Sequence, residues 1–137
     1  MLHLAAADEA DLAVISAQMQ DALIKRADMR YDARRRRFIL VANRFAWDAL
    51  PEKQRRRAGL HFDDVEAAQV LGMDNARPDA VLSLLAITFT AGEAPAGMID
   101  LHFAAGLQIR LSVAAINISL ADLGGMWSTA QVPAHAS

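Results

Sequence analysis

Cysteine is absent from this chain of 137 residues, and its absence excludes several kinds of chemistry. Without a thiol the chain has no disulfide framework, no cysteine nucleophile and no Cys-ligated zinc or iron–sulfur cluster. Long apolar runs are also missing. The run at 82–87 is among the longest, far short of the roughly 20 residues that a membrane-spanning helix requires. Aromatic residues make up only 6% of the chain. Because readers of single-stranded RNA usually display several exposed rings, this scarcity weighs against such a role.

The composition that remains is that of one folded domain. Hydrophobic residues account for 54% of the chain and charged residues for 22%, which is enough apolar material for a core and too little net charge for disorder. A length of 137 residues suits a single domain. We expect that domain over 1–127, followed by a flexible tail over 128–137. The start has no basic leader and soon turns acidic, so we expect a cytoplasmic protein.

The charged residues are strongly segregated along the chain. The segment 25–57 holds 12 of the 14 basic and four of the 16 acidic residues, a formal charge of +8, so the rest carries −10. Guanidinium groups form bidentate contacts with phosphate or carboxylate. The candidate anion- or partner-binding residues are therefore Arg34, Arg35, Arg36, Arg37, Arg44, Arg55, Arg56 and Arg57. The alternative is that both arginine runs are solvated and neutralised by the acidic remainder of the same domain.

The first half of the chain predicts a strand, a helix and further strands. We expect a strand at 2–6 and a helix capped by Asp8 or Asp11, whose apolar stripe includes Leu12, Ile15, Met19, Ala22 and Leu23. Alternation predicts a strand at 27–31, and the sequence at 32–35 predicts a turn. Further strands are expected at 38–47 and 56–62, with a turn or bulge at 63–64. Residues 65–71 fit strand or helix, and we favour strand.

The second half predicts a hairpin and then a second helix. A loop at 73–80 precedes a strand at 81–90. The strands 98–103 and 107–113 alternate cleanly around a three-residue loop that ends at Gly106, which can take positive φ. In this register Phe103 opposes Leu107, Leu101 opposes Ile109 and Asp100 opposes Arg110. Helical spacing then predicts a helix over 113–123 with a glycine stop at 124–125, Trp127 packed on the core, and a frayed end at 131–137.

Together these elements predict an α+β domain with a mainly antiparallel barrel or sandwich, because short connections join sequential strands. One helix follows the first strand and the other closes an end. A strand meander that ends in a helix resembles the layout of a pleckstrin-homology-like barrel, and that comparison concerns layout alone.

Several segments give the chain a resemblance to a known family. They are Arg37-Phe38, Asn43 to Trp47, Gly97 to Phe103, Ile109 to Leu111 and Leu120 to Leu123. The chain resembles a family of small alphaproteobacterial proteins of unknown function, from its opening strand to about Trp127. These motifs are structural in character, so the resemblance implies no activity, substrate or active-site residue.

Catalytic and metal-binding signals are weak. His61 and Asp63 share one face of a strand, as do Asp100 and His102, so adjacent strands would bring four weak metal-ligand candidates together. The alternative is that all four are ordinary solvent-facing positions. No serine or threonine lies in a glycine-flanked elbow, and no glycine-rich loop precedes a helix. We therefore expect no cofactor.

The sequence favours a non-enzymatic protein-interaction or scaffold module of the bacterial cytoplasm, with another protein or a second copy as partner and no membrane contact. The alternative is that the arginine-rich hairpin binds nucleic acid or a phosphorylated ligand. A metal-dependent enzyme ranks below both.

Overall fold

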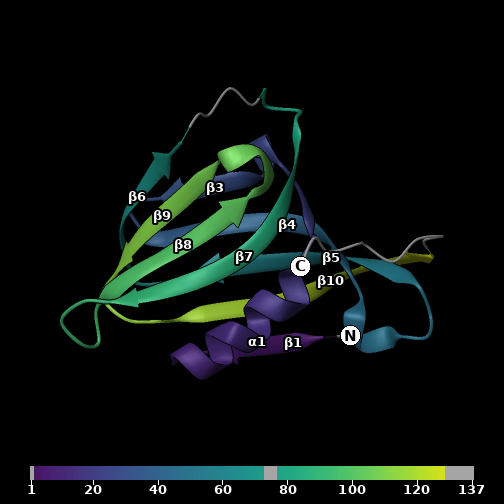
Figure 1. The fold of residues 1–137 in the computed structure, drawn as a ribbon, viewed down its shortest axis with the longest axis horizontal. Helices are drawn as coiled ribbons and strands as arrows, with labels where there is room; N and C mark the ends of the chain where they lie inside the picture. The colour runs from purple at the N-terminus through teal and green to yellow at the C-terminus, as the bar shows by residue number, and fades with distance from the viewer. Residues whose placement is uncertain (1, 73–76, 129–137) are drawn as a thin grey trace.

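The structure, a computed structural model, describes residues 2–72 and 77–128, with 125–128 as backbone only. Ten strands form one open, mainly antiparallel sheet in the order β1-β10-β5-β4-β2-β7-β8-β9-β6, and β3 pairs with β4 (Figure 1). The elements are β1 (His3–Ala6), α1 (Glu9–Met19), β2 (Leu23–Lys25), β3 (Met29–Asp32), β4 (Arg37–Phe45), β5 (Gln54–Phe62), β6 (Val65–Leu71), β7 (Val81–Ala91), β8 (Gly97–Phe103), β9 (Gln108–Val113) and β10 (Ile118–Ser128).

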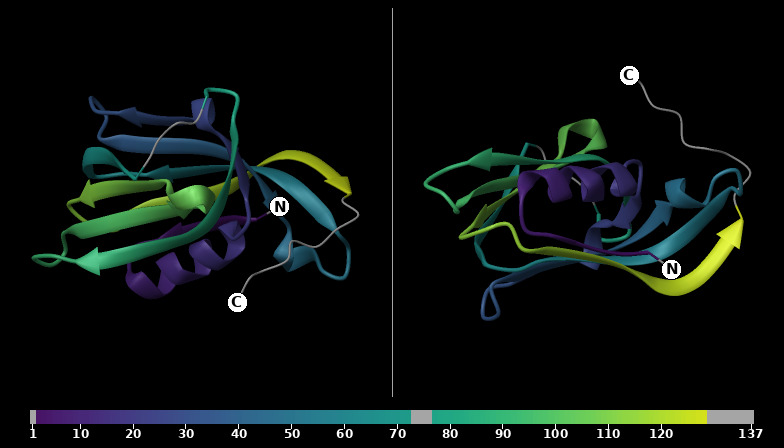
Figure 2. Two further views of the ribbon diagram at one scale, coloured as in Figure 1. Left: turned by 45° about the horizontal axis from the view of Figure 1, so that its top comes forward. Right: turned by 90° about the horizontal axis from the view of Figure 1, so that it is seen from below.

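The sheet folds over into two layers that enclose the core. The first layer contains β3, β4, β5, β10 and β1, and the second contains β7, β8, β9 and β6 (Figure 2, right). The short strand β2 pairs with β4 and with β7 and so joins the layers at one corner. At the other corner the pair β5–β10 continues into the pair β6–β9, where the Asp63 N–H donates to the Asn117 carbonyl at 2.8 Å.

Alternation along the strands sends one set of side chains into the space between the layers. On β4 and β5 this set includes Phe38, Leu40, Leu60 and Phe62, all at most 4% exposed. The rings of Phe38 and Phe62 lie 6.1 Å apart. Because each strand has a buried face and an outward face, the sequence alternation is that of a half-buried sheet.

Helix α1 lies between β1 and β7 and covers one side of the core. The Asp8 Oδ1 accepts a hydrogen bond from the Asp11 N–H at 2.8 Å, which is the expected N-cap. The stripe buries Leu12, Ile15 and Met19. The helix ends at Met19, however, so Ala22 and Leu23 lie outside it and Leu23 opens β2. No helix among residues 2–72 and 77–128 is long and apolar enough to cross a membrane.

The predicted hairpin is confirmed. In β8 and β9, Leu101 opposes Ile109 and Asp100 opposes Arg110. The Phe103 N–H donates to the Leu107 carbonyl at 2.9 Å, and Gly106 has a φ of 81°. The strand expected at 65–71 is present as β6 with the same bounds, and those expected at 2–6, 38–47, 56–62 and 81–90 are present as β1, β4, β5 and β7 with shifted ends.

The predicted C-terminal helix is wrong. Residues 118–128 form the strand β10, which pairs with β1 on one side and β5 on the other. The helical spacing of the apolar residues gave the wrong prediction because these residues do not share one buried face: Leu120 is fully buried, whereas Leu123 faces outward and is 54% exposed. Gly124, with a φ of 84°, lies at a register shift between Asp122 and Met126 and does not end a helix. In the described part of the chain the resemblance to a pleckstrin-homology-like layout therefore loses its closing helix.

The strand expected at 27–31 is present only in its second part. Residues 26–28 form a short 3-10 helix, and β3 begins only at Met29. A break there lets β2 and β3 pair with different parts of the same edge of β4. The side chain of Trp127, the residues 73–76 of the expected loop and the tail at 131–137 lie outside the described residues.

Candidate functional site

The turn predicted between β3 and β4 is present at 33–36, so Arg34, Arg35 and Arg36 lie in it and Arg37 is the first residue of β4. The Asp32 Oδ1 accepts a hydrogen bond from the Arg35 N–H at 3.2 Å. Three of the four guanidinium groups have a carboxylate nearby: Arg35 lies 3.9 Å from Asp32, Arg36 3.3 Å from Glu66 and Arg37 2.6 Å from Asp63. Much of the charge of this run is therefore balanced by the chain's own acids.

The Arg55–Arg57 run lies within β5, and the alternation of the strand divides it. Arg56 points inward with a side chain 15% exposed, and its Nη1 lies 3.4 Å from the Asp122 Oδ2. Arg55 and Arg57 point the other way. The Arg55 Nη1 donates to the Asn43 carbonyl at 3.3 Å. Burial lowers the pKa of Arg55, although the charge of Asp21 acts in the opposite direction.

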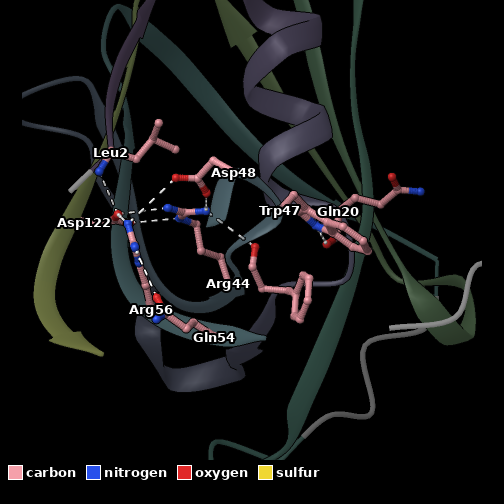
Figure 3. A network of polar contacts seen from close by, with 9 residues as sticks. Leu2, Gln20, Arg44, Trp47, Asp48, Gln54, Arg56 and Asp122 are labelled. Carbon is pink, nitrogen blue, oxygen red and sulfur yellow. Dashed lines mark hydrogen bonds and ion pairs between the residues drawn. The ribbon is translucent and has the colours of Figure 1, made fainter. Parts of the chain in front are cut away.

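Four charged side chains form an ion cluster around the buried pair Arg44–Asp122, with Asp48 and Arg56 on its more exposed side (Figure 3). We call Arg44, Asp48, Arg56 and Asp122 the buried ion cluster. Arg44 is completely buried. Its Nε and Nη2 donate to the two Asp122 carboxylate oxygens at 2.8 and 2.9 Å, and its Nη1 donates to the Asp48 Oδ1 at 2.9 Å. The Leu2 N–H also donates to the Asp122 Oδ2 at 2.8 Å. Two positive and two negative charges leave the cluster formally neutral.

The electrostatics of the buried ion cluster follow from this geometry. Burial disfavours each charged form, but the hydrogen bonds and charges of the partners outweigh it. The pKa of Arg44 is therefore raised, and the pKa values of Asp48 and Asp122 are lowered. Since every charge is matched inside the protein, the cluster serves to hold β4, β5, β10 and the N-terminal segment together. Arg44 and Arg56 are thus engaged internally.

The two arginine runs do not share one end of the sheet. In the antiparallel pair β4–β5, Arg37 opens β4, whereas Arg55 and Arg57 lie opposite Phe45 and Asn43 at its far end. Six residues along a strand separate Arg37 from Asn43, roughly 20 Å. The eight arginines thus fall into three places: the turn, the buried ion cluster and the outward side of β5.

The four metal-ligand candidates do not converge. The His61 Nδ1 lies 3.2 Å from the Asp63 Oδ2 on the first layer. Asp100 and His102 lie on β8 in the second layer. There the Arg110 Nε donates to Asp100 at 2.9 Å, and the His102 Nε2 lies 2.8 Å from the Thr88 Oγ1. Among residues 2–72 and 77–128, no three His, Asp or Glu side chains are grouped to hold a metal ion.

The ion pair between Asp100 and Arg110 confirms the cross-strand pairing expected from the sequence. Burial alone raises the pKa of Asp100, but hydrogen bonds from Arg110 and Gln108 outweigh it, so that pKa is lowered. The hydrogen bond and the charge of Asp100 raise the pKa of Arg110. This pair supports the register of β8 and β9, and both of its charges are matched.

A pocket of about 420 Å³ opens where β2, β4 and β5 meet. Leu23, Asn43 and Arg57 stand in one row across these three strands, and Lys25 lies two residues along β2 on the same side. The lining residues are Leu23, Lys25, Asp28, Val41, Ala42, Asn43, Arg57 and Val81. Neither Lys25 nor Arg57 forms an ion pair with a side chain that the structure describes. We call this the Lys25–Arg57 pocket.

Sequence reasoning identified only Arg57 among the polar residues of this pocket. Lys25 lies in the basic segment but outside both arginine runs, and Asn43 carries no charge. Only the register across β2, β4 and β5 brings the three together. Asp122 was missed as well, although an acid at an inward position of an apolar strand is a signal that a buried cation faces it.

Comparison with known proteins gives a family and no activity. No curated protein and no solved structure matches the chain. One family model matches residues 2–135, nearly the whole chain, and its description is "Protein of unknown function (DUF2948)". The expectation of a family of unknown function is therefore correct, while its taxonomic range is not shown. The chain belongs to the DUF2948 family.

Proposed function

We propose that this protein is a protein-interaction module that binds an acidic segment of a partner at the Lys25–Arg57 pocket. The observation that carries the proposal is that two exposed cations border one pocket without a described acidic partner. A carboxylate placed between Lys25 and Arg57 would receive charge-assisted hydrogen bonds from both. The exposed Asn43 amide lies next to Arg57 across the sheet and adds a further donor.

The other cationic candidates support this choice of site. Arg35, Arg36 and Arg37 each have a carboxylate nearby, and Arg44 is buried. An incoming acid at the turn competes with those existing partners, whereas one at the Lys25–Arg57 pocket does not. Asp28 also lines the pocket, so a doubly charged phosphate group is disfavoured there relative to a singly charged carboxylate.

An acidic protein segment fits the described surface better than nucleic acid does. Binding to single strands commonly uses exposed aromatic rings as stacking platforms. Here the Tyr31 hydroxyl donates to the Val65 carbonyl at 2.9 Å. The Trp47 indole N–H donates to the Gln20 carbonyl at 3.2 Å, and its ring packs edge-on against Phe45 at 4.6 Å. Both rings are thus engaged within the protein.

The test is a titration of the protein into a fluorescently labelled oligo-glutamate peptide at low salt, followed by fluorescence anisotropy. We compare the wild type with the double variant Lys25→Ser/Arg57→Ser. Loss of two contacts worth about 1 kcal/mol each weakens binding roughly 30-fold. The matched control is Arg34→Ser/Arg35→Ser, which removes the same charge from the β3–β4 turn and is expected to bind within a few-fold of wild type.

Equal weakening by both double variants would show binding by overall charge and refute the pocket. Absence of wild-type binding would refute the proposed function itself. A labelled single-stranded oligonucleotide serves as the second probe. If it binds more tightly than the peptide and depends on the same two residues, the nucleic-acid alternative replaces the proposal.

A further inference from the structure

The outward face of the first layer continues from the Lys25–Arg57 pocket. Strand pairing places Val41, Gly59 and Ala121 in one row across β4, β5 and β10, and all three are half-buried. Leu123 lies beside them, with its Cδ atoms 3.4 Å from the position of a Cβ on Gly59. No described helix covers this face, because α1 lies on the core side (Figure 2, right). Its centre is therefore small, apolar and accessible.

The outward face of the second layer is different in character. It carries polar side chains that already pair with one another, as Asp100 does with Arg110 and Thr88 with His102, although Met98 beside them is 41% exposed. The charge of Arg110 on this face is therefore already matched. An apolar centre bordered by unpaired cations is instead typical of a surface that another element covers.

Helix α1 has the complementary properties. It buries Leu12, Ile15 and Met19, yet its outward side is also apolar: Val14 is 51% exposed and is accompanied by Ala10, Ala13 and Ala17. Its N-terminus is acidic, with Asp8 as the cap and Glu9 and Asp11 in the first turn, and no basic residue lies in the helix. A helix at the surface of a single domain normally presents a polar outward side.

We propose that the outward face of the first layer receives α1 of a second copy of this chain, with the acidic first turn in the Lys25–Arg57 pocket. This inference rests on the proposed function, since α1 is then the acidic segment that the pocket binds. Asp11 and Val14 lie three residues apart and therefore share one side of α1, roughly 4.5 Å apart along its axis. Asn43 and Val41 both line the pocket and lie two residues apart on β4, roughly 7 Å. With the Asp11 carboxylate between Lys25 and Arg57, Val14 lies over Val41 and Gly59.

The geometry has a consequence for assembly. The helix and the face that receives it are different surfaces of one chain, and α1 cannot reach the outward face of its own sheet because it packs against β1 and β7. Such a contact is heterologous, so each added copy leaves one free helix and one free face. Association therefore continues beyond a dimer, into rings or open chains, and weakens as salt screens the acidic turn from the cations.

The test is sedimentation velocity of the full chain over a concentration series, at low and at high salt. The wild type is expected to show a sedimentation coefficient that increases with concentration at low salt and falls at high salt. Two charge-reversal variants are then compared: Glu9→Lys/Asp11→Lys, which leaves the Asp8 cap intact, and Lys25→Glu/Arg57→Glu. Each alone is expected to be monomeric, and their mixture is expected to associate again because each opposite pair of charges is restored.

A second pair of variants, one test and one control, examines the apolar part of the contact. Val14→Ser is expected to weaken association, whereas Val70→Ser, at a residue 43% exposed on β6, is expected to leave it unchanged. Circular dichroism checks that each variant folds. A wild type that stays monomeric throughout, or association that persists in either charge-reversal variant, would overturn the inference. If the oligo-glutamate peptide still binds at the pocket in that case, the proposed function stands and only the choice of α1 fails.

Discussion

The buried ion cluster makes a sharp prediction about the substitution Asp122→Asn. The Asp122 side chain is 1% exposed and accepts hydrogen bonds from Arg44, Arg56 and the Leu2 N–H. Asparagine has nearly the same shape but carries no charge, and its amide N–H groups face a guanidinium that can only donate. The change therefore leaves the Arg44 charge buried with Asp48 as its remaining carboxylate.

The magnitude follows from what Arg44 loses. Removal of one partner from a buried ion pair costs about 3–5 kcal/mol, because the other charge stays uncompensated. The Arg44–Asp48 contact at 2.9 Å remains and limits the loss. We therefore expect Asp122→Asn to lower the free energy of unfolding by about 3 kcal/mol, the lower end of this range. With a urea m-value of about 2 kcal/mol per molar, the unfolding midpoint falls by about 1.5 M.

The assay is urea unfolding followed by circular dichroism, for the wild type, Asp122→Asn and the double variant Arg44→Met/Asp122→Leu. The double variant removes both charges and fills the space with apolar groups, so we expect it to regain most of the lost stability. Arg56 and Asp48, 3.8 Å apart, then remain as a pair. A loss below about 1 kcal/mol for Asp122→Asn, or a double variant less stable than the single one, would refute the reasoning.

Two further predictions concern the pH dependence of the stability and the substitution of a glycine. Because the pKa values of Asp48 and Asp122 are lowered in the folded state, the unfolded chain binds more protons in acid. Their stabilising contribution is complete above about pH 5 and is lost as the pH falls through the folded pKa values. Urea midpoints against pH should show this fall and a smaller one for Asp122→Asn; equal falls would contradict it. Gly97→Ala would bring a Cβ against the Phe89 ring and the Thr90 carbonyl, which costs about 1–3 kcal/mol of unfolding free energy. The control Gly92→Ala meets only ordinary contacts, the nearest at 3.5 Å, and should be nearly neutral in the same urea assay; equal destabilisation by both would contradict the steric argument.

Local sequence patterns predicted most of the strands correctly. The prediction failed where a pattern fitted a helix and a strand equally well. The hairpin of β8 and β9 was predictable in register because alternation and a short glycine loop act over neighbouring residues. Residues 113–123 fit helical spacing equally well, and only pairing with β1 and β5 decides for a strand. Strand propensity depends on such pairing, which a single sequence does not contain.

The candidate site shows the same division. The charge segregation and the turn at Arg34–Arg37 follow directly from sequence. The environment of each arginine does not follow from the sequence. Arg44 is buried, Arg56 lies with it in the buried ion cluster, and Arg57 borders a pocket. Strand alternation predicts that Arg56 and Arg57 point to opposite faces of the sheet. Which of the two faces is buried is decided only by the packing of the two layers against each other.

By itself the sequence determined the absence of cysteine chemistry, the α+β character, the helix N-cap and the basic segment, because these depend on composition and on contacts a few residues apart. The tertiary structure alone decided that Asp122 neutralises Arg44 from 78 residues away and that Lys25 stands near Arg57. Such contacts arise from strand pairing between distant segments, and their energies depend on burial, which local sequence does not specify.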